Sequence, residues 1–207
     1  MANNNARLEE IEQMNRSAHD KMAEDISALE CALGIPTEDL DLFFKQIPGN
    51  YMLDAGCGWG RYVSRFIEQG LDYVGIDHSA KMLAASQEKN PQQQFIQESH
   101  HQLPFDWDTF DGIWACCALG GEPKIRMPEI LREYRRVLQP EGILLIIMQD
   151  TFMSKEEIVS NDPEVGPLYH SFWYSEELGQ ALLDAHFKIA YQTHRFECGS
   201  MTFLATK

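Results

Sequence analysis

The sequence contains no hydrophobic run that approaches the roughly 20 residues needed to cross a bilayer. Its opening stretch, MANNNARLEE, also lacks the basic start and the apolar segment that are typical of a signal peptide. We therefore expect a soluble, cytoplasmic protein with no membrane partner. With 207 residues and 44% hydrophobic content, the chain is long enough for one globular domain with a substantial core.

Positive charge is scarce, because 17 Lys and Arg residues stand against 32 Asp and Glu residues, a formal net charge of -15. Such a surface repels phosphate backbones, so nucleic acid is not an expected partner. The sequence also has no Cys-x-x-Cys pair and no Cys/His spacing typical of zinc, so we expect no bound metal. The number of cysteines, 5, is odd, and we expect reduced thiols.

An amphipathic helix is predicted over residues 8–33, because apolar side chains recur there at steps of three and four. Gly34 and Pro36 are expected to end this helix. A shorter helix is expected to follow, with Thr37 as its cap. We expect these segments to form a helical cap over residues 1–48.

From Tyr51 onward, short apolar runs with strand character alternate with helical segments. Such alternation predicts an α/β fold, a three-layer sandwich in which helices cover both faces of a parallel sheet. The last two strand segments, 187–195 and 200–207, are too close in sequence for a crossover helix, so they must be antiparallel. Residues 49–207 are therefore predicted to form a seven-stranded, mostly parallel sheet with an antiparallel last strand. The region 150–174 shows no clear element and is a candidate lid.

Three glycines, Gly56, Gly58 and Gly60, follow the first predicted strand in the segment LDAGCGWGRY. Glycine costs roughly 0.5–1 kcal/mol relative to alanine within a regular element, so this cluster indicates a turn that a ligand approaches closely. In an open parallel sheet, ligands bind at the carboxyl ends of the strands. A dinucleotide fits poorly, because Arg61 stands where the motif Gly-x-Gly-x-x-Gly has its third glycine.

The segment 54–60, DAGCGWG, closely resembles the first motif of class I S-adenosylmethionine-dependent methyltransferases. Further segments are similar to motifs of that family in the same order, namely LPFDWDTFDGIW at 103–114, REYRRVLQPEG at 132–142 and FWYSEELGQALLDAHFKIA at 172–190. Glu141 and His186 replace glycines that are usual in the family. The resemblance covers about residues 50–207 and implies S-adenosyl-L-methionine as cofactor and S-adenosyl-L-homocysteine as product.

The resemblance also implies which residues hold the cofactor. Asp77, which ends the second predicted strand, would accept hydrogen bonds from the ribose hydroxyls, and Asp54 would help to fix the methionine amino group. The family's adenine-binding acid is absent, since Ser99 falls at its place and Glu98 lies one residue earlier. The expected cofactor-binding residues are Asp54, Gly56, Cys57, Gly58, Gly60, Asp77, His78, Met82, Glu98, Ser99, His100 and Ala115.

Methyl transfer is an in-line displacement, so a protein of this family mainly aligns the acceptor, the methyl carbon and the sulfur. A general base is needed only if the acceptor arrives protonated. The segment GPLYHSFWY, residues 166–174, is rich in aromatic side chains and follows the fifth predicted strand. Within it, Tyr169 and His170 are the candidate catalytic residues, and a surface histidine is the competing interpretation of His170.

The leading hypothesis is methyl transfer to a small organic acceptor at oxygen, nitrogen or carbon. Residues 1–50 and 151–177 are rich in acids and are expected to border the substrate entrance. Such an entrance repels RNA and admits neutral or cationic molecules. The alternatives are a non-catalytic S-adenosylmethionine-binding regulatory protein and an RNA-modifying methyltransferase. We expect a monomer or a homodimer.

Overall fold

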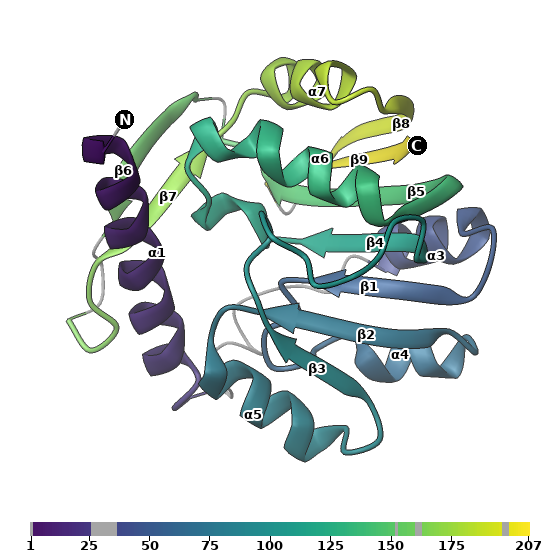
Figure 1. Ribbon diagram of the computed structural model, residues 1–207, viewed down its shortest axis with the longest axis horizontal. Coiled ribbons are helices and arrows are strands. Elements are labelled where there is room, and N and C mark those ends of the chain that lie inside the picture. Colours follow the sequence, from purple (N-terminus) through teal and green to yellow (C-terminus); the bar gives the residue numbers. More distant parts are fainter. Residues whose placement is uncertain (1, 26–36, 152, 160–162, 196–198) are drawn as a thin grey trace.

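The computed structural model describes residues 2–25, 37–151, 153–159, 163–195 and 199–207. Within these residues, a seven-stranded sheet in the order β3-β2-β1-β4-β5-β9-β8 forms the centre of the molecule (Figure 1). Its strands are β1 (Tyr51–Ala55), β2 (Asp72–Asp77), β3 (Gln94–Gln97), β4 (Phe110–Cys116), β5 (Leu138–Gln149), β8 (Lys188–Arg195) and β9 (Ser200–Thr206).

The strand directions confirm the predicted fold class. Strands β1 to β5 pair in parallel, whereas β9 runs antiparallel to both β5 and β8. The chain proceeds from β1 outward to β2 and β3 and then returns to β4 on the other side of β1. The sheet therefore has a switch point between β1 and β4, which is where ligands of open α/β sheets bind.

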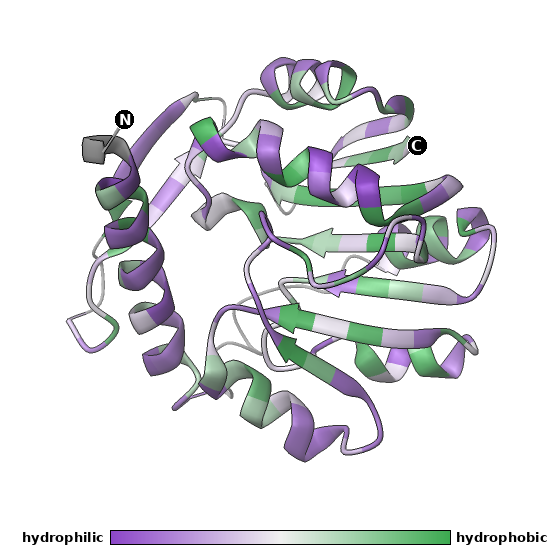
Figure 2. Ribbon diagram, viewed as in Figure 1, coloured by the Kyte–Doolittle hydropathy of each residue, from purple (hydrophilic) through white to green (hydrophobic). Residues whose placement is uncertain are grey.

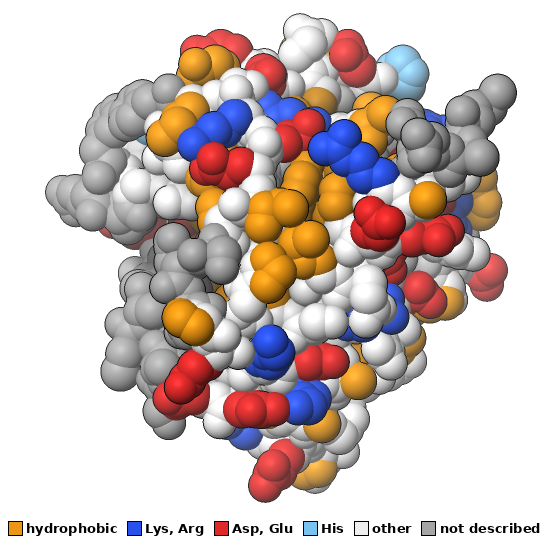
Figure 3. All heavy atoms as spheres, turned by 90° about the vertical axis from the view of Figure 1, so that its left-hand side faces the viewer, with side chains coloured by type: hydrophobic (Ala, Val, Ile, Leu, Met, Phe, Trp, Pro, Cys, Tyr) orange, Lys and Arg blue, Asp and Glu red, His pale blue; other side chains and the backbone are white. Residues whose placement is uncertain are grey.

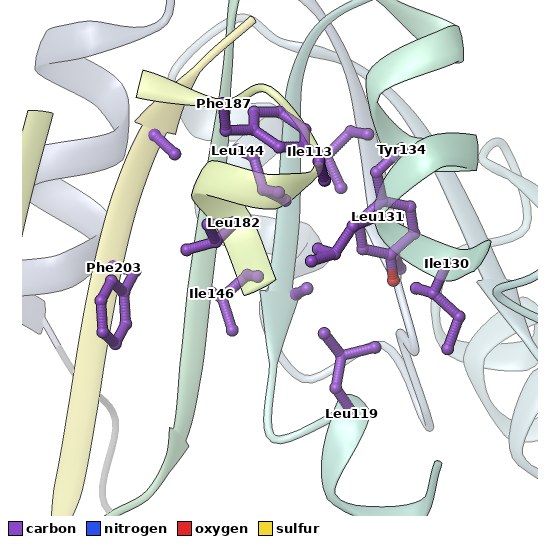
Figure 4. Close-up of a cluster of buried hydrophobic side chains, with 14 of the residues drawn as sticks. Ile113, Leu119, Ile130, Leu131, Tyr134, Leu144, Ile146, Leu182, Phe187 and Phe203 are labelled. Atoms are coloured by element: carbon purple, nitrogen blue, oxygen red, sulfur yellow. The ribbon is translucent and has the colours of Figure 1, made fainter. Parts of the chain in front are cut away.

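Helices cover both faces of the sheet. They are α3 (Thr37–Gln46), α4 (Val63–Glu68), α5 (Ala80–Lys89), α6 (Met127–Val137) and α7 (Ser175–Asp184). Because successive side chains of a strand point to opposite faces, Met52 packs with side chains of α3 and α4, and Leu53 lies in the cluster formed with α6 and α7. Figure 4 shows this second cluster, in which Leu131 and Tyr134 of α6 lie over Ile113 of β4.

The first helix, α1 (Ala2–Met22), stands beside the carboxyl ends of β1, β2 and β4 (Figure 1). It is largely hydrophilic, as its colour in Figure 2 shows. Ile11, Asn15 and Ala18 are buried and form one narrow stripe at helical spacing. The helix therefore packs as a cover over polar and apolar groups and is not part of the main core.

Residues 150–174, for which the sequence predicts no element, contain an antiparallel pair of strands. These are β6 (Lys155–Val159) and β7 (Leu168–Phe172). Tyr169 and Ser171 of β7 are buried and alternate with less buried neighbours, so the segment has the period of a strand. The sequence analysis does not predict this pairing because the first three residues of β6, Lys155 to Glu157, are charged, and only Ile158 and Val159 have strand character.

The helix predicted over 8–33 instead runs from Ala2 to Met22 in the structure. Residues 26–36, which include the predicted end at Gly34 and Pro36, lie outside the described residues. Among the helices that the structure describes, none combines the length and the apolar character that a membrane span requires.

Hydrogen bonds attach α1 at two separate places. Asn15, which is 1% exposed, donates from Nδ2 to the carbonyl oxygens of Gly121 at 2.8 Å and Tyr169 at 3.2 Å. Its Oδ1 accepts the N–H of Tyr169 at 2.8 Å. Further along the helix, the Ser79 hydroxyl donates to Asp20 at 2.5 Å, at the start of α5. Helix α1 thereby connects the β6–β7 pair with the loop between β2 and α5.

Replacing Asn15 by alanine should destabilise the protein by about 2–3 kcal/mol, because the buried N–H of Tyr169 loses its acceptor and two carbonyls lose a donor. Urea unfolding followed by circular dichroism measures the loss. Gln13→Ala, on the exposed side of the same helix, is the control and should change stability by less than about 0.5 kcal/mol. Equal stability of the two variants would contradict this account of α1.

Candidate active site

The glycine turn follows directly from β1 and faces the switch point. The N–H groups of Gly56 and Cys57 both donate to the carbonyl oxygen of Ile76 at 2.9 Å, which fixes the turn against β2. Gly56 and Gly58 have φ of 81° and 54°, in the left-handed region that favours glycine. A Cβ at Gly58 would meet no atom within 4 Å, so open space lies against the backbone there.

Gly60 has a different reason to be glycine. Its φ is 74°, and a Cβ there would collide with the Ser86 hydroxyl of α5. The third glycine of the turn therefore lets α4 and α5 pack closely and does not line the cavity described below.

Asp77 joins the turn to the next loop through both of its carboxylate oxygens. Oδ2 accepts the N–H of Gly58 at 3.0 Å, and Oδ1 accepts the N–H of Ser79 at 2.9 Å. A carboxylate offers about four lone-pair positions, so Asp77 can accept two further donors. Vicinal hydroxyls of a ribose are donors of this kind.

Asp54, in β1, is 2% exposed and accepts a hydrogen bond from the Tyr73 hydroxyl at 2.9 Å. The pKa of Asp54 is raised to about 7, mainly by burial; the hydrogen bond from the Tyr73 hydroxyl opposes this rise, and the negative charge of Asp77 contributes to it. A cationic group bound beside Asp54 would favour the ionised form.

A cavity of about 660 Å³ lies over the turn and the carboxyl ends of the strands. Figure 3 looks onto this side of the molecule, where hydrophobic side chains gather near the middle of the face and charged side chains surround them. The structure brings these predicted site residues to the cavity wall: Asp54, Gly56, Cys57, Gly58, Asp77, His78, Met82 and His100.

Three further predicted cofactor-binding residues, Ala115, Glu98 and Ser99, do not reach the cavity wall. Ala115 is fully buried within β4, opposite Ile146 of β5. Glu98 turns its carboxylate back to the N–H of Ser99 at 3.0 Å, and neither side chain lines the cavity. Met82 does line it, at the first turn of α5, which is consistent with contact to a flat ring.

The two predicted catalytic residues, Tyr169 and His170, are also absent from the wall. Tyr169 is 4% exposed and donates its hydroxyl to Glu156 of β6. The imidazole of His170 stacks near Phe172, with ring centroids 4.5 Å apart, and lies against Gly120. The Tyr169 side chain thus bonds β7 to β6, and the His170 side chain packs β7 against the segment after β4.

Imidazoles form one side of the cavity. His19 Nδ1 of α1 and His78 Nε2 are 2.6 Å apart, and the Tyr134 hydroxyl is 2.7 Å from His100 Nδ1. Burial, with the charge of His78 adding to it, lowers the pKa of His19 and of His100 to about 4. This side of the cavity is therefore uncharged at neutral pH and suits an aromatic base.

Several cavity residues escaped the sequence analysis because only the folded chain brings them together. They are His19, Met22, Trp59, Arg61, Tyr62, Cys116, Cys117, Glu122, Ile147 and Arg195. Cys117 has a φ of 55°, unusual for a residue with a Cβ. A hydrogen bond from Cys116 and the charge of Arg61 lower the pKa of its thiol. A signal was present in the sequence, because the positions after β4 face a switch-point cleft.

An open α/β sheet with an antiparallel last strand, a glycine turn after β1 and a carboxylate at the end of β2 define the class I methyltransferase fold. Residues 53–146 match the family described as "Methyltransferase domain". The chain therefore contains a segment that matches a methyltransferase domain, and its fold is that of the class I S-adenosylmethionine-dependent methyltransferases.

Two curated relatives are similar in sequence to this chain. It is 31% identical over 137 residues to the methyltransferase-like protein YqeM of Bacillus subtilis, covering 61% of this chain and 56% of YqeM. It is 32% identical over 102 residues to demethylmenaquinone methyltransferase of Renibacterium salmoninarum, covering 48% of this chain and 41% of that protein. The chain thus spans about half the length of the curated relatives it matches.

A solved structure shows the same fold over nearly the whole chain. This is 1,6-didemethyltoxoflavin-N1-methyltransferase of Burkholderia thailandensis, determined with 1,6-didemethyltoxoflavin and S-adenosylhomocysteine bound. The TM-score is 0.76 at 19% identity, with 97% of this chain and 90% of that chain covered. S-adenosylmethionine is the cofactor of this class, and the open space against Gly58 beside the Asp77 carboxylate fits it.

Replacing Asp77 by alanine should weaken S-adenosylhomocysteine binding by roughly 30-fold or more, because hydrogen bonds to a charged acceptor contribute about 1.5–3 kcal/mol each. Isothermal titration calorimetry measures the change, with circular dichroism to show that the variant is folded. Asp72→Ala is the matched control, since Asp72 is exposed at the other end of β2 and binds the Asn50 side chain. Unchanged affinity in Asp77→Ala would contradict the site.

The pKa of Asp54 predicts a pH dependence of binding. The cofactor's ammonium group favours the ionised carboxylate, so binding expels a proton and should strengthen by roughly tenfold from pH 6 to pH 8. Titrations of S-adenosylhomocysteine across this range check it, and Asp54→Asn should flatten the profile. The stability of the ligand-free protein changes with pH in the opposite direction. Because the pKa of Asp54 is higher in the folded chain than in the unfolded chain, its contribution to the free energy of unfolding is present at low pH and is lost as the pH rises through about 7.

Proposed function

We propose that the protein transfers a methyl group from S-adenosylmethionine to a small organic acceptor, at an oxygen, nitrogen or carbon atom. The observation that carries the proposal is the cavity that joins Gly58 and Asp77 to a second wall, formed by Tyr62 and by the carboxyl ends of β4 and β5. Its volume of about 660 Å³ lies within the range of small-molecule sites, roughly 300–1,000 Å³.

The second wall has the character of an acceptor site. Tyr62, Cys116 and Ile147 present apolar surface to the cavity, and Tyr62 Oη lies 3.6 Å from Cys116 Sγ. Arg61 stacks over the rings of Trp59 and Tyr62, with its guanidinium carbon 5.9 Å and 5.5 Å from their centroids. A wall of this kind accommodates a flat organic molecule better than a nucleic acid backbone.

The relatives support a small acceptor. One is named for methylating demethylmenaquinone, and the structural neighbour is named for methylating N1 of 1,6-didemethyltoxoflavin. The net charge of -15 adds to this, because a polyanion such as RNA would be repelled. We also propose that residues 1–48 and 150–174 border the entrance as cap and lid, that the protein acts as a monomer or a homodimer, and that it is cytoplasmic.

The chain's own residues have few chemical tasks in such a reaction. When bound, S-adenosylmethionine supplies a methyl group that its positive sulfur has already activated. Asp77 and the backbone at Gly58 hold the nucleoside end, and Asp54 orients the amino acid end through its carboxylate. Tyr62 and Ile147 keep water away from the reacting atoms, which lets the aligned acceptor attack in line.

A second candidate is an S-adenosylmethionine-binding regulatory protein without catalysis. It is favoured by the absence of Tyr169 and His170, the predicted catalytic residues, from the cavity wall. Both candidates predict S-adenosylhomocysteine binding, so only methyl transfer separates them.

Separate incubations with tritiated S-adenosylmethionine and either the low-molecular-mass fraction of a cell extract or purified tRNA test the proposal. We expect label in a small product with the wild-type protein and none with Asp77→Ala, whereas Asp72→Ala should behave as wild type. Cofactor binding without any labelled product would favour the regulatory protein, and label in tRNA would favour an RNA-modifying enzyme. Stabilisation by NAD and not by S-adenosylhomocysteine in a thermal melt would overturn both, since a ligand at 100 times its Kd adds about 2.7 kcal/mol.

A further inference from the structure

One carboxyl group on the cavity wall has no part in the cofactor contacts described above. It belongs to Glu122, which follows the short 3-10 helix η1 (Leu119–Gly121) at the carboxyl end of β4. The same cavity is lined by Gly58 and Asp77. Glu122 therefore stands on the side of the switch point opposite the residues that hold the nucleoside.

The backbone that carries Glu122 is held from three directions. Its own N–H donates to the carbonyl of Leu119 at 3.2 Å. Asn15 of α1 donates to the carbonyl of Gly121 at 2.8 Å, and the Ser171 hydroxyl of β7 donates to the carbonyl of Gly120 at 3.3 Å. A side chain on so well-anchored a segment keeps a fixed direction, which a group that handles a proton requires.

The charged and titratable groups that face Glu122 come from four elements. The charges of Arg126 in η2 (Lys124–Arg126) and of Glu12 in α1 shift the pKa of Glu122. The charge of Glu122 in turn raises the pKa of Tyr134 in α6 and of Tyr169 in β7. Arg126 does not pair with Glu122, because its Nη1 lies 2.7 Å from the His101 ring and 3.8 Å from Glu12. Among the described residues, none forms a hydrogen bond or an ion pair with the Glu122 carboxyl, which leaves it available to a ligand.

Burial raises the pKa of Glu122 to about 7, the charge of Arg126 opposes this shift, and Glu12 adds to it. The group is therefore shared between its acid and its carboxylate form at neutral pH. The cavity histidines and Asp54 already have partners, since His100 contacts Tyr134, His78 contacts His19, and Asp54 accepts from Tyr73.

We propose that Glu122 is a catalytic residue that faces the reacting sulfur and methyl group and accepts the proton of an O–H or N–H acceptor. This inference rests on the proposed function. In the transfer, the acceptor atom forms a bond to the methyl carbon while the carbon–sulfur bond breaks, and its electron pair stays on sulfur as neutral S-adenosylhomocysteine. The acceptor's proton moves to the Glu122 carboxylate and later leaves to water.

The charge difference between the two cofactor forms gives a test that needs no acceptor. S-adenosylmethionine carries a positive sulfur and S-adenosylhomocysteine a neutral one, and otherwise they differ only by the methyl group. A carboxyl beside that sulfur loses its proton when the cationic form binds. Asp54 loses its proton to the same extent with both molecules, because both carry the same ammonium group. Its contribution therefore cancels when the protons released by the two ligands are compared.

Calorimetric titrations with each molecule, in buffers of different ionisation enthalpy, measure the protons released. We expect S-adenosylmethionine to release up to about half a proton more than S-adenosylhomocysteine at pH 7. The ratio of their affinities should also shift toward S-adenosylmethionine by roughly 3- to 10-fold from pH 6 to pH 8. Both effects should vanish in Glu122→Gln, which keeps the shape of the side chain.

Glu38→Gln is the matched control, because Glu38 lines the same cavity but is ion-paired with Arg195 at 2.9 Å. It should keep the wild-type difference. If both ligands bind and Glu122→Gln retains the proton difference, or wild type shows none, the assignment of Glu122 is wrong while the proposed function stands. If neither ligand binds, the proposed function itself fails.

On any O–H or N–H acceptor, Glu122→Gln should lower kcat by roughly 100-fold, with KM for S-adenosylmethionine within threefold and the pH dependence of kcat near 7 lost.

Discussion

The site depends on the carboxylate of Asp77, which bonds at once to the N–H groups of Gly58 and Ser79. These two groups belong to the loops that follow neighbouring parallel strands, β1 and β2. The carboxylate therefore fixes the distance between the loops before a ligand arrives. Because charge-assisted hydrogen bonds to a partly buried carboxylate are strong, the open space against Gly58 is formed in advance, and a ligand pays little to order it.

Much of this arrangement could be predicted because it is local in sequence. The strand, the glycines after it and Asp77 lie within one strand–helix–strand unit, and the alternation of elements determined the sheet. The sequence analysis assigns Gly60 to the cofactor, whereas in the structure Gly60 leaves room for Ser86 of α5. Sequence spacing does not reveal which atoms a Cβ at this position would meet. Tyr169 and His170 were assigned to catalysis because they follow β5, but pairing with β6 turns them to other contacts. Glu122 escaped notice because its environment comes from α1, α6 and β7, far away in the sequence.

Two backbone positions, one in the first residues of β5 and one after α7, keep a conformation that suits glycine although neither residue is glycine. Glu141 and His186 stand where the family usually has glycine, and they have φ of 67° and 64°. Residues with a Cβ disfavour this region by roughly 1–2 kcal/mol. Both positions nevertheless keep it, since the strands and helices on either side determine where the chain must pass. Here tertiary packing overrides local preference, as it does in the β6–β7 pair.

Helix α1 is bonded to two parts of the cavity rim, through His19 and Asp20 to the loop after β2 and through Asn15 to η1 and β7. The rim of the nucleoside half and the rim of the acceptor half therefore share one rigid body. Any ligand whose binding depends on the position of one end of this helix is therefore linked to whatever contacts the other end, and such a linkage acts in both directions.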